Sequence, residues 1–162
     1  MNSFSISQVE SSNKLINCLL KSHFLKLVAK IPWPTDATTT IAMSTVNAAL
    51  SSSASAIIVV TLSDQLSYLI SKYRPRCPII AVSSGKQTTR QARLYRGILP
   101  LHFPGEIVDM ERDVDERLNA AIKFSKNLGL IKQGDSVIIV TSWRNGTDGT
   151  DATNTMRLAQ IQ

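Results

Sequence analysis

Cysteine and histidine are scarce in this sequence, which contains two residues of each. Cys18 and Cys77 are too few for the disulfide framework of a small secreted protein, and we expect both to be buried free thiols of a reduced compartment. His23 and His102 belong to no Cys-x-x-Cys or His-x-x-x-His pattern. We therefore expect neither a disulfide-stabilised protein nor a metal centre.

Long apolar runs are missing too. No segment approaches the roughly 20 consecutive apolar residues that cross a bilayer, and the N-terminus lacks the basic-then-apolar order of a signal peptide. We expect a cytoplasmic protein without a membrane partner. Aromatic residues make up 6% of the chain and do not alternate with the basic ones, so nucleic acid is not expected as a partner.

The composition that remains is typical of a globular domain. The 162 residues are 43% hydrophobic and 19% charged, and we expect a single domain over residues 1–162, with residues 1–8 as a loose extension. The net charge is +6. Its one loose basic group is typical of a solvated helix face, with a phosphate-binding surface as the alternative. This group consists of Lys86, Arg90, Arg93 and Arg96.

Residues 56–62 form a strongly apolar segment, because six of the seven are apolar and four are Ile or Val. This pattern is typical of a strand buried on both faces. Ser63 and Asp64 then cap a helix, and a second apolar strand follows at residues 78–82. Parallel sheets place ligands beyond the carboxyl ends of their strands, so the turn from Thr61 to Leu66 is the first candidate site.

Helical and extended patterns alternate along the rest of the chain. We expect a helix over residues 9–28 with His23 partly buried at the border of its apolar stripe, and a helix over residues 37–52 capped by Thr35 or Asp36. A helix over residues 87–95 precedes a strand over residues 98–103. Pro100 cannot donate a hydrogen bond to a sheet, which predicts that this strand lies at the edge of the sheet or that the proline lies near a strand end.

The C-terminal part continues the alternation. A helix ending at Leu128 has a buried stripe of Val114, Leu118, Ala121, Ser125 and Leu128. A strand over residues 136–141, a loop over residues 142–153 and a terminal strand over residues 154–161 follow. The predicted fold is a three-layer α/β/α sandwich.

Six segments together resemble the C-terminal, regulatory domain of pyruvate kinase. The most specific are Tyr-Arg-Pro-Arg-x-Pro-Ile-Ile-Ala-Val at residues 73–82 and Arg-Gln-x-x-Leu-Tyr-Arg-Gly at residues 90–97. The other segments are residues 35–42, 56–61, 134–141 and 154–157. The resemblance covers the chain from about Val9 to its end, and implies a five-stranded mixed sheet with four parallel strands and an antiparallel last one.

The resemblance also implies that catalysis lies elsewhere. In pyruvate kinase, phosphoryl transfer occurs on a separate (β/α)8 barrel that binds magnesium and potassium, and such a barrel needs about 250 residues. The residues themselves agree, because we find neither a glycine-rich phosphate loop nor converging carboxylates. The acidic residues between Asp109 and Glu116 are interpreted as favourable charge at a helix N-terminus. We expect no catalytic residues, no cofactor and no enzymatic activity in the isolated chain.

The same family implies an allosteric site for a sugar bisphosphate. Its first turn typically reads Thr-Lys-Ser-Gly-Arg-Ser/Thr, and here Thr61 and Ser63 are kept whereas Leu62, Asp64 and Leu66 replace the lysine, the glycine and the last hydroxyl. An aspartate repels phosphate, and Asp64 can cap the helix itself. The resemblance therefore implies a degenerate pocket.

Further effector residues are implied on two later segments. Arg117 matches an arginine that contacts the second phosphate, and the alternative is a surface arginine paired with Asp113. Met110 stands where several members have tryptophan. The last loop resembles the Thr-Gly-Trp-Arg-x-Gly effector loop, which assigns Trp143, Arg144, Gly146 and Gly149 to the site.

Three functions remain open. The first is a non-catalytic regulatory and oligomerisation domain that forms a homodimer through the strand Asn154 to Ile161. The second is a working sensor of fructose bisphosphate or another phosphorylated metabolite. The third is a subunit or fragment of an active pyruvate kinase.

Overall fold

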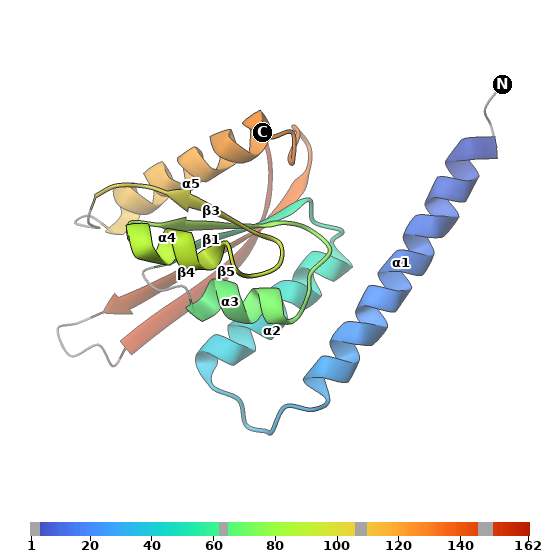
Figure 1. The fold of residues 1–162 in the computed structure, drawn as a ribbon, viewed down its shortest axis with the longest axis horizontal. Coiled ribbons are helices and arrows are strands. Elements are labelled where there is room, and N and C mark those ends of the chain that lie inside the picture. Colours follow the sequence, from blue (N-terminus) through green and yellow to red (C-terminus); the bar gives the residue numbers. More distant parts are fainter. Residues whose placement is uncertain (1–3, 62–64, 106–109, 146–150) are drawn as a thin grey trace. The chain divides into compact units, whose positions relative to one another are not determined.

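The computed structural model describes residues 4–61, 65–105, 110–145 and 151–162. Its contacts divide the chain into two compact units, residues 1–34 and 35–162. The first unit contains α1, Phe4–Val28 (Figure 1). This helix begins before the expected Val9, so that residues 4–8, expected as part of a loose extension, are helical.

Two expectations for α1 were wrong. Cys18 is exposed rather than buried, and His23 is exposed rather than partly buried. Apolar side chains of the same helix are exposed as well, with exposed fractions of 67% for Leu15 and 70% for Leu19. Helical periodicity shows which residues share a face, but it does not show whether another element covers that face.

The second unit is built on a five-stranded sheet of order β3-β2-β1-β4-β5. β1 pairs in parallel with β2 and β4, β2 pairs in parallel with β3, and β5 is antiparallel to β4. Four parallel strands and one antiparallel strand confirm the expected sheet, and β3 lies at its edge as Pro100 predicted. The strands are β1 Ala56–Thr61, β2 Ile79–Ser83, β3 Ile98–His102, β4 Ser136–Asn145 and β5 Asp151–Gln160.

Helices cover both faces of this sheet (Figure 1), which confirms the three-layer architecture. On one face, α5 packs Leu118 and Ala121 against Ile58 and Ile80 of the central strands. On the other face, α2 and α3 pack against each other and against the sheet. The helices of this unit are α2 Ala37–Ser51, α3 Gln65–Lys72, α4 Lys86–Ala92 and α5 Met110–Asn127.

The ends of these elements follow from single residues. Asp36 caps α2, because its carboxylate accepts a hydrogen bond of 3.0 Å from the amide of Thr39. The hydrogen bonds from Thr39 hold the pKa of Asp36 below its usual value. Gly129 has a φ of +69° after the end of α5, a conformation that side chains other than glycine rarely adopt.

Other boundaries also differ from the expected ones. The helix α4 ends at Ala92, three residues before the expected residue 95. Residues 142–145 and 151–153, expected in a loop, extend β4 and β5, so that the β4–β5 pair runs from Ser136↔Gln160 to Asn145↔Asp151. Leu128, expected in the buried stripe of α5, has an exposed fraction of 52%. It lies just beyond the last helical residue, where the helical period no longer sets the direction of the side chain.

Candidate functional site

The carboxyl ends of β1 and β4 bring two of the predicted segments together. Thr61 ends β1 and lies opposite Ser142 in the parallel register. Trp143 and Arg144 continue β4 past the end of β1, where their only strand partner in the described chain is β5. The backbone therefore places Thr61, Trp143 and Arg144 at the carboxyl end of the sheet.

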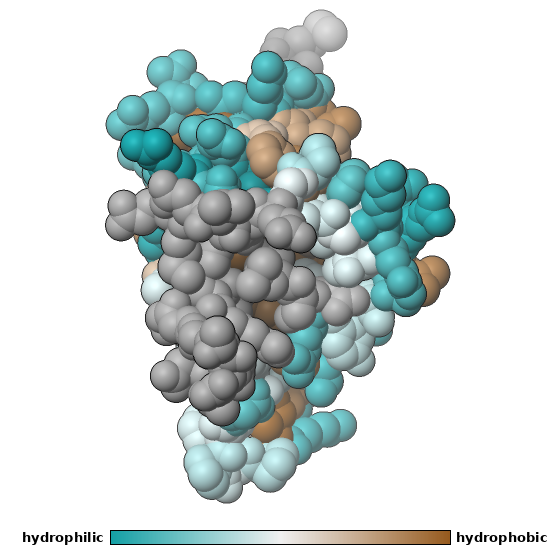
Figure 2. Space-filling model, turned by 90° about the vertical axis from the view of Figure 1, so that its left-hand side faces the viewer, coloured by the Kyte–Doolittle hydropathy of each residue, from teal (hydrophilic) through white to brown (hydrophobic). Residues whose placement is uncertain are grey.

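Several predicted residues lie outside the described part of the chain. These are Ser63, Gly146 and Gly149, together with the side chains of Thr61, Trp143, Arg144 and Met110. Figure 2 faces this end of the sheet, and many of the described residues around it are hydrophilic. The described side chains that bear on the site are those of Leu66, Arg117 and Asn154.

Leu66 is buried in the first turn of α3, with an exposed fraction of 2%. It occupies the position at which the family pattern has a phosphate-binding hydroxyl. A leucine supplies no hydrogen-bond donor, and its burial directs the side chain into the protein rather than to a ligand. This position therefore belongs to the hydrophobic core.

Arg117 is buried on α5, with an exposed fraction of 2%. Its Nη2 donates a hydrogen bond of 2.8 Å to the carbonyl oxygen of Gly105, and its Cζ lies 5.1 Å from the centroid of the Phe103 ring. The alternative interpretation of Arg117 as a surface arginine was therefore wrong. Sequence reasoning missed this burial because Arg117 adjoins the apolar stripe of α5 and no local pattern marks it.

The contacts of Arg117 show where it lies and what it can still bind. Phe103 and Gly105 follow the carboxyl end of β3. Because β3 runs parallel to β2 and β1, Arg117 lies at the same carboxyl end of the sheet as Thr61. Its Nε has no hydrogen-bond partner among the described residues. A carbonyl oxygen and an aromatic ring thus contact the guanidinium, and within the described residues no acceptor faces its Nε–H.

A polar pair at the base of the β4–β5 hairpin was not predicted as part of the site. The hydroxyls of Thr141 and Thr155 lie 2.5 Å apart. Asn154 pairs with Ser142 in the sheet, and its Oδ1 is buried without a partner among the described residues. The polar residues of the terminal strand were the available signal, but they also fit an ordinary exposed strand.

The described residues contain no group of three or more His, Cys, Asp or Glu residues placed to hold a metal ion. None of the helices described is both long enough and apolar enough to span a membrane.

Comparison with known proteins identifies the family. The model of the pyruvate kinase alpha/beta domain matches residues 39–159. Pyruvate kinase of Debaryomyces hansenii is 38% identical over 128 residues, which cover 78% of this chain and 25% of the relative. Human pyruvate kinase PKLR is 39% identical over 140 residues, which cover 85% of this chain and 24% of the relative.

A third relative shows the same coverage. Pyruvate kinase 1 of Saccharomyces cerevisiae is 37% identical over 131 residues, which cover 80% of this chain and 26% of the relative. The chain therefore spans about a quarter of the length of the curated relatives it matches. Together with the five-stranded mixed sheet, the match over residues 39–159 shows that this chain belongs to the pyruvate kinase family and corresponds to its C-terminal alpha/beta domain.

Proposed function

We propose that this chain is a non-catalytic regulatory and oligomerisation domain of the pyruvate kinase type. The observation that carries this proposal is that the family match falls on the alpha/beta domain alone, residues 39–159. The chain aligns with about a quarter of the length of its relatives, whereas a catalytic barrel alone takes about 250 residues. The magnesium and potassium of the family belong to that barrel, so we assign this chain no cofactor, and we propose a cytoplasmic location.

We further propose that the sugar-bisphosphate pocket is degenerate. The burial of Leu66 supports this, because the hydroxyl of the family pattern has been replaced by a core side chain. Leu62 and Asp64 replace the lysine and glycine of the same turn. A phosphate would lose a cation and a hydroxyl there, and it would meet an added carboxylate.

Calorimetric titration with fructose 1,6-bisphosphate tests the degenerate pocket. We expect the natural chain to give no saturable heat that depends on Arg117. The double variant Leu62→Lys/Asp64→Gly restores the lysine and the glycine of the family pattern without touching the buried Leu66, and we expect it to gain measurable affinity. Saturable binding by the natural chain that is lost in Arg117→Met would contradict the proposal.

The absence of catalysis has its own assay. We expect no pyruvate above the enzyme-free blank when the purified chain is incubated with phosphoenolpyruvate, ADP, magnesium and potassium. Turnover by the chain alone would contradict the proposal. A subunit of an active pyruvate kinase instead predicts that activity appears when a barrel lacking its alpha/beta domain is added. This second experiment is included because the chain aligns with only about a quarter of each relative.

A working sensor is the second candidate, and Arg117 is the observation that favours it. The arginine is retained at the carboxyl end of the sheet, and its buried Nε has no partner among the described residues. A sensor predicts saturable binding of fructose 1,6-bisphosphate that is lost in Arg117→Met. The variant Arg90→Gln is the control, because Arg90 lies exposed on α4.

Homodimerisation is proposed through β5. This strand is the last in the sheet order, and Met156 and Leu158 on it have exposed fractions of 37% and 61%. An open edge strand with apolar side chains pairs readily with a second copy. We expect light scattering to give the mass of a dimer that Leu158→Lys shifts towards monomer. A monomer at all concentrations would contradict this assignment.

A further inference from the structure

The positive charge of this protein is concentrated in one continuous segment. Residues 65–105 contain seven lysine and arginine residues and no aspartate or glutamate. The whole chain has a net charge of +6, so the rest of the sequence is close to neutral. The segment forms α3, β2, α4 and β3, so the charge lies in the half of the sheet order that contains β3 and β2.

Three of these arginines surround a single cavity of about 290 Å³. Arg74 and Arg76 come from the connection between α3 and β2, and Arg96 comes from the connection between α4 and β3. Both connections precede strands, so the cavity lies at the amino ends of β2 and β3, opposite the end that holds Thr61. The rest of its lining includes Cys77, Pro78 and Leu130.

Hydrogen bonds that involve Ser71 join the two arginine-bearing connections. The hydroxyl of Ser71 donates a bond of 2.7 Å to the carbonyl oxygen of Arg96. The amide of Arg74 donates a bond of 2.9 Å to the carbonyl oxygen of Ser71. Arg74 has a φ of +54°, an uncommon conformation for a residue other than glycine. The positions of these arginine backbones are therefore fixed before any ligand binds.

The chemistry of the lining favours an anion. Guanidinium groups repel one another around a shared space, and each can bind a phosphate or carboxylate through two parallel hydrogen bonds. Burial raises the pKa of Cys77 to about 11, so the thiol adds no negative charge at neutral pH. The side chains of the three arginines are exposed, and Pro78 and Leu130 make part of the wall apolar.

We propose that this cavity binds a compact organic phosphate with at least two negative charges. The volume of about 290 Å³ is at the lower end of ligand pockets, which favours a small ligand over a nucleotide. This site is separate from the degenerate effector pocket and does not depend on it. Arg74, Arg76 and Arg96 bind the phosphate oxygens.

Calorimetric titration of the full chain with pyrophosphate tests the proposal at physiological ionic strength. We expect saturable binding of one pyrophosphate per chain, with affinity that falls as salt rises. Arg96→Gln removes one guanidinium and leaves the backbone carbonyl that Ser71 binds, and we expect it to weaken binding about 10-fold or more. Arg74→Asn removes a second guanidinium, and asparagine tolerates a positive φ.

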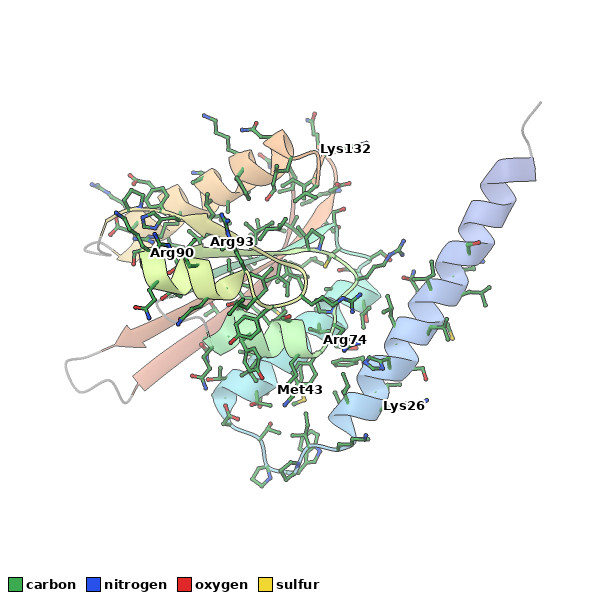
Figure 3. The ribbon with its side chains drawn as sticks, in the orientation of Figure 1. Lys26, Met43, Arg74, Arg90, Arg93 and Lys132 are labelled. Atoms are coloured by element: carbon green, nitrogen blue, oxygen red, sulfur yellow. The ribbon has the colours of Figure 1, made fainter. Side chains whose placement is uncertain are left out.

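Arg90→Gln is the matched control, because it removes the same charge from α4. Figure 3 shows Arg90 on α4, well away from Arg74 beyond the end of α3. We expect its affinity to stay within about 2-fold of the natural chain, because Arg90 is not among the residues that line the cavity. Thermal unfolding of each variant checks that the fold is intact.

Three results would overturn the proposal. One is the absence of saturable heat with pyrophosphate. Another is equal weakening by Arg90→Gln and Arg96→Gln, which would indicate attraction to the net charge alone. The last is that Arg117→Met loses pyrophosphate binding whereas Arg96→Gln keeps it, which would place the ligand at the carboxyl end of the sheet instead.

Discussion

Leu66→Ser tests whether the last position of the turn that follows β1 belongs to the core. Leu66 has an exposed fraction of 2%, and burying a leucine side chain stabilises a protein by about 1.5–3 kcal/mol. The cavity left behind raises the cost of such truncations to about 2–5 kcal/mol. The new hydroxyl adds about 1–3 kcal/mol if it finds no partner. These costs add to about 3–8 kcal/mol. Because single substitutions rarely cost more than about 5 kcal/mol, we expect the free energy of unfolding to fall by about 3–5 kcal/mol.

Urea denaturation followed by circular dichroism measures this loss. For a chain of this size, each kcal/mol lowers Tm by about 2–4 °C, so the variant should melt roughly 6–20 °C below the natural protein. Leu94→Ser is the control, because Leu94 has an exposed fraction of 82%. Its effect should stay within about 0.5 kcal/mol. If both variants lose the same stability, Leu66 is not a core residue and the reasoning about the lost hydroxyl fails.

Three further predictions concern a helix cap, a turn and the two thiols. Asp36→Ala should lower the free energy of unfolding by about 1 kcal/mol at pH 7. Hydrogen bonding lowers the pKa of Asp36 in the folded state, so the difference between the two proteins in urea titrations should vanish as the pH falls below 3.8. A difference that does not depend on pH would contradict this prediction. Gly129→Ala should cost about 1–2 kcal/mol through backbone strain alone, since φ is +69° and nothing lies within 4 Å of an added Cβ. Gly129→Asn should cost less. Equal melting temperatures for the natural protein and both variants would refute this prediction. Thiol labelling of the native chain should modify the exposed Cys18 and spare the buried Cys77 until urea unfolds it, so two modified thiols in the native protein would be the contrary result.

Most of the sheet could be predicted from the sequence, because strand burial and turn chemistry are local signals. Ala56–Thr61 is apolar on both faces and lies between two parallel strands, which is what a run of Ile and Val indicates. Pro100 predicted the edge position of β3 for a similar reason, since a central strand requires its amide donor. Asp36 and Gly129 marked helix ends by side chains and conformations that act within a few residues.

Burial that depends on a distant partner could not be predicted. Cys18 and His23 share a helix face with apolar residues, yet both are exposed. Arg117 was placed on the surface in one interpretation, whereas Phe103 and Gly105 from another segment enclose it. The cavity between Arg74 and Arg96 joins residues from two connections, so the helical spacing of the basic residues could not reveal it.

The sheet order also has a consequence for how the chain folds as it leaves the ribosome. β1 pairs with β2 early, but its other neighbour is β4, with Ile58 opposite Ile139. A nascent chain that has emerged only through α5 therefore exposes one side of its most apolar strand. Such distant pairings form slowly, and an unpaired strand edge promotes aggregation. Synthesis of β4 is thus the step that ends the vulnerable period of this domain.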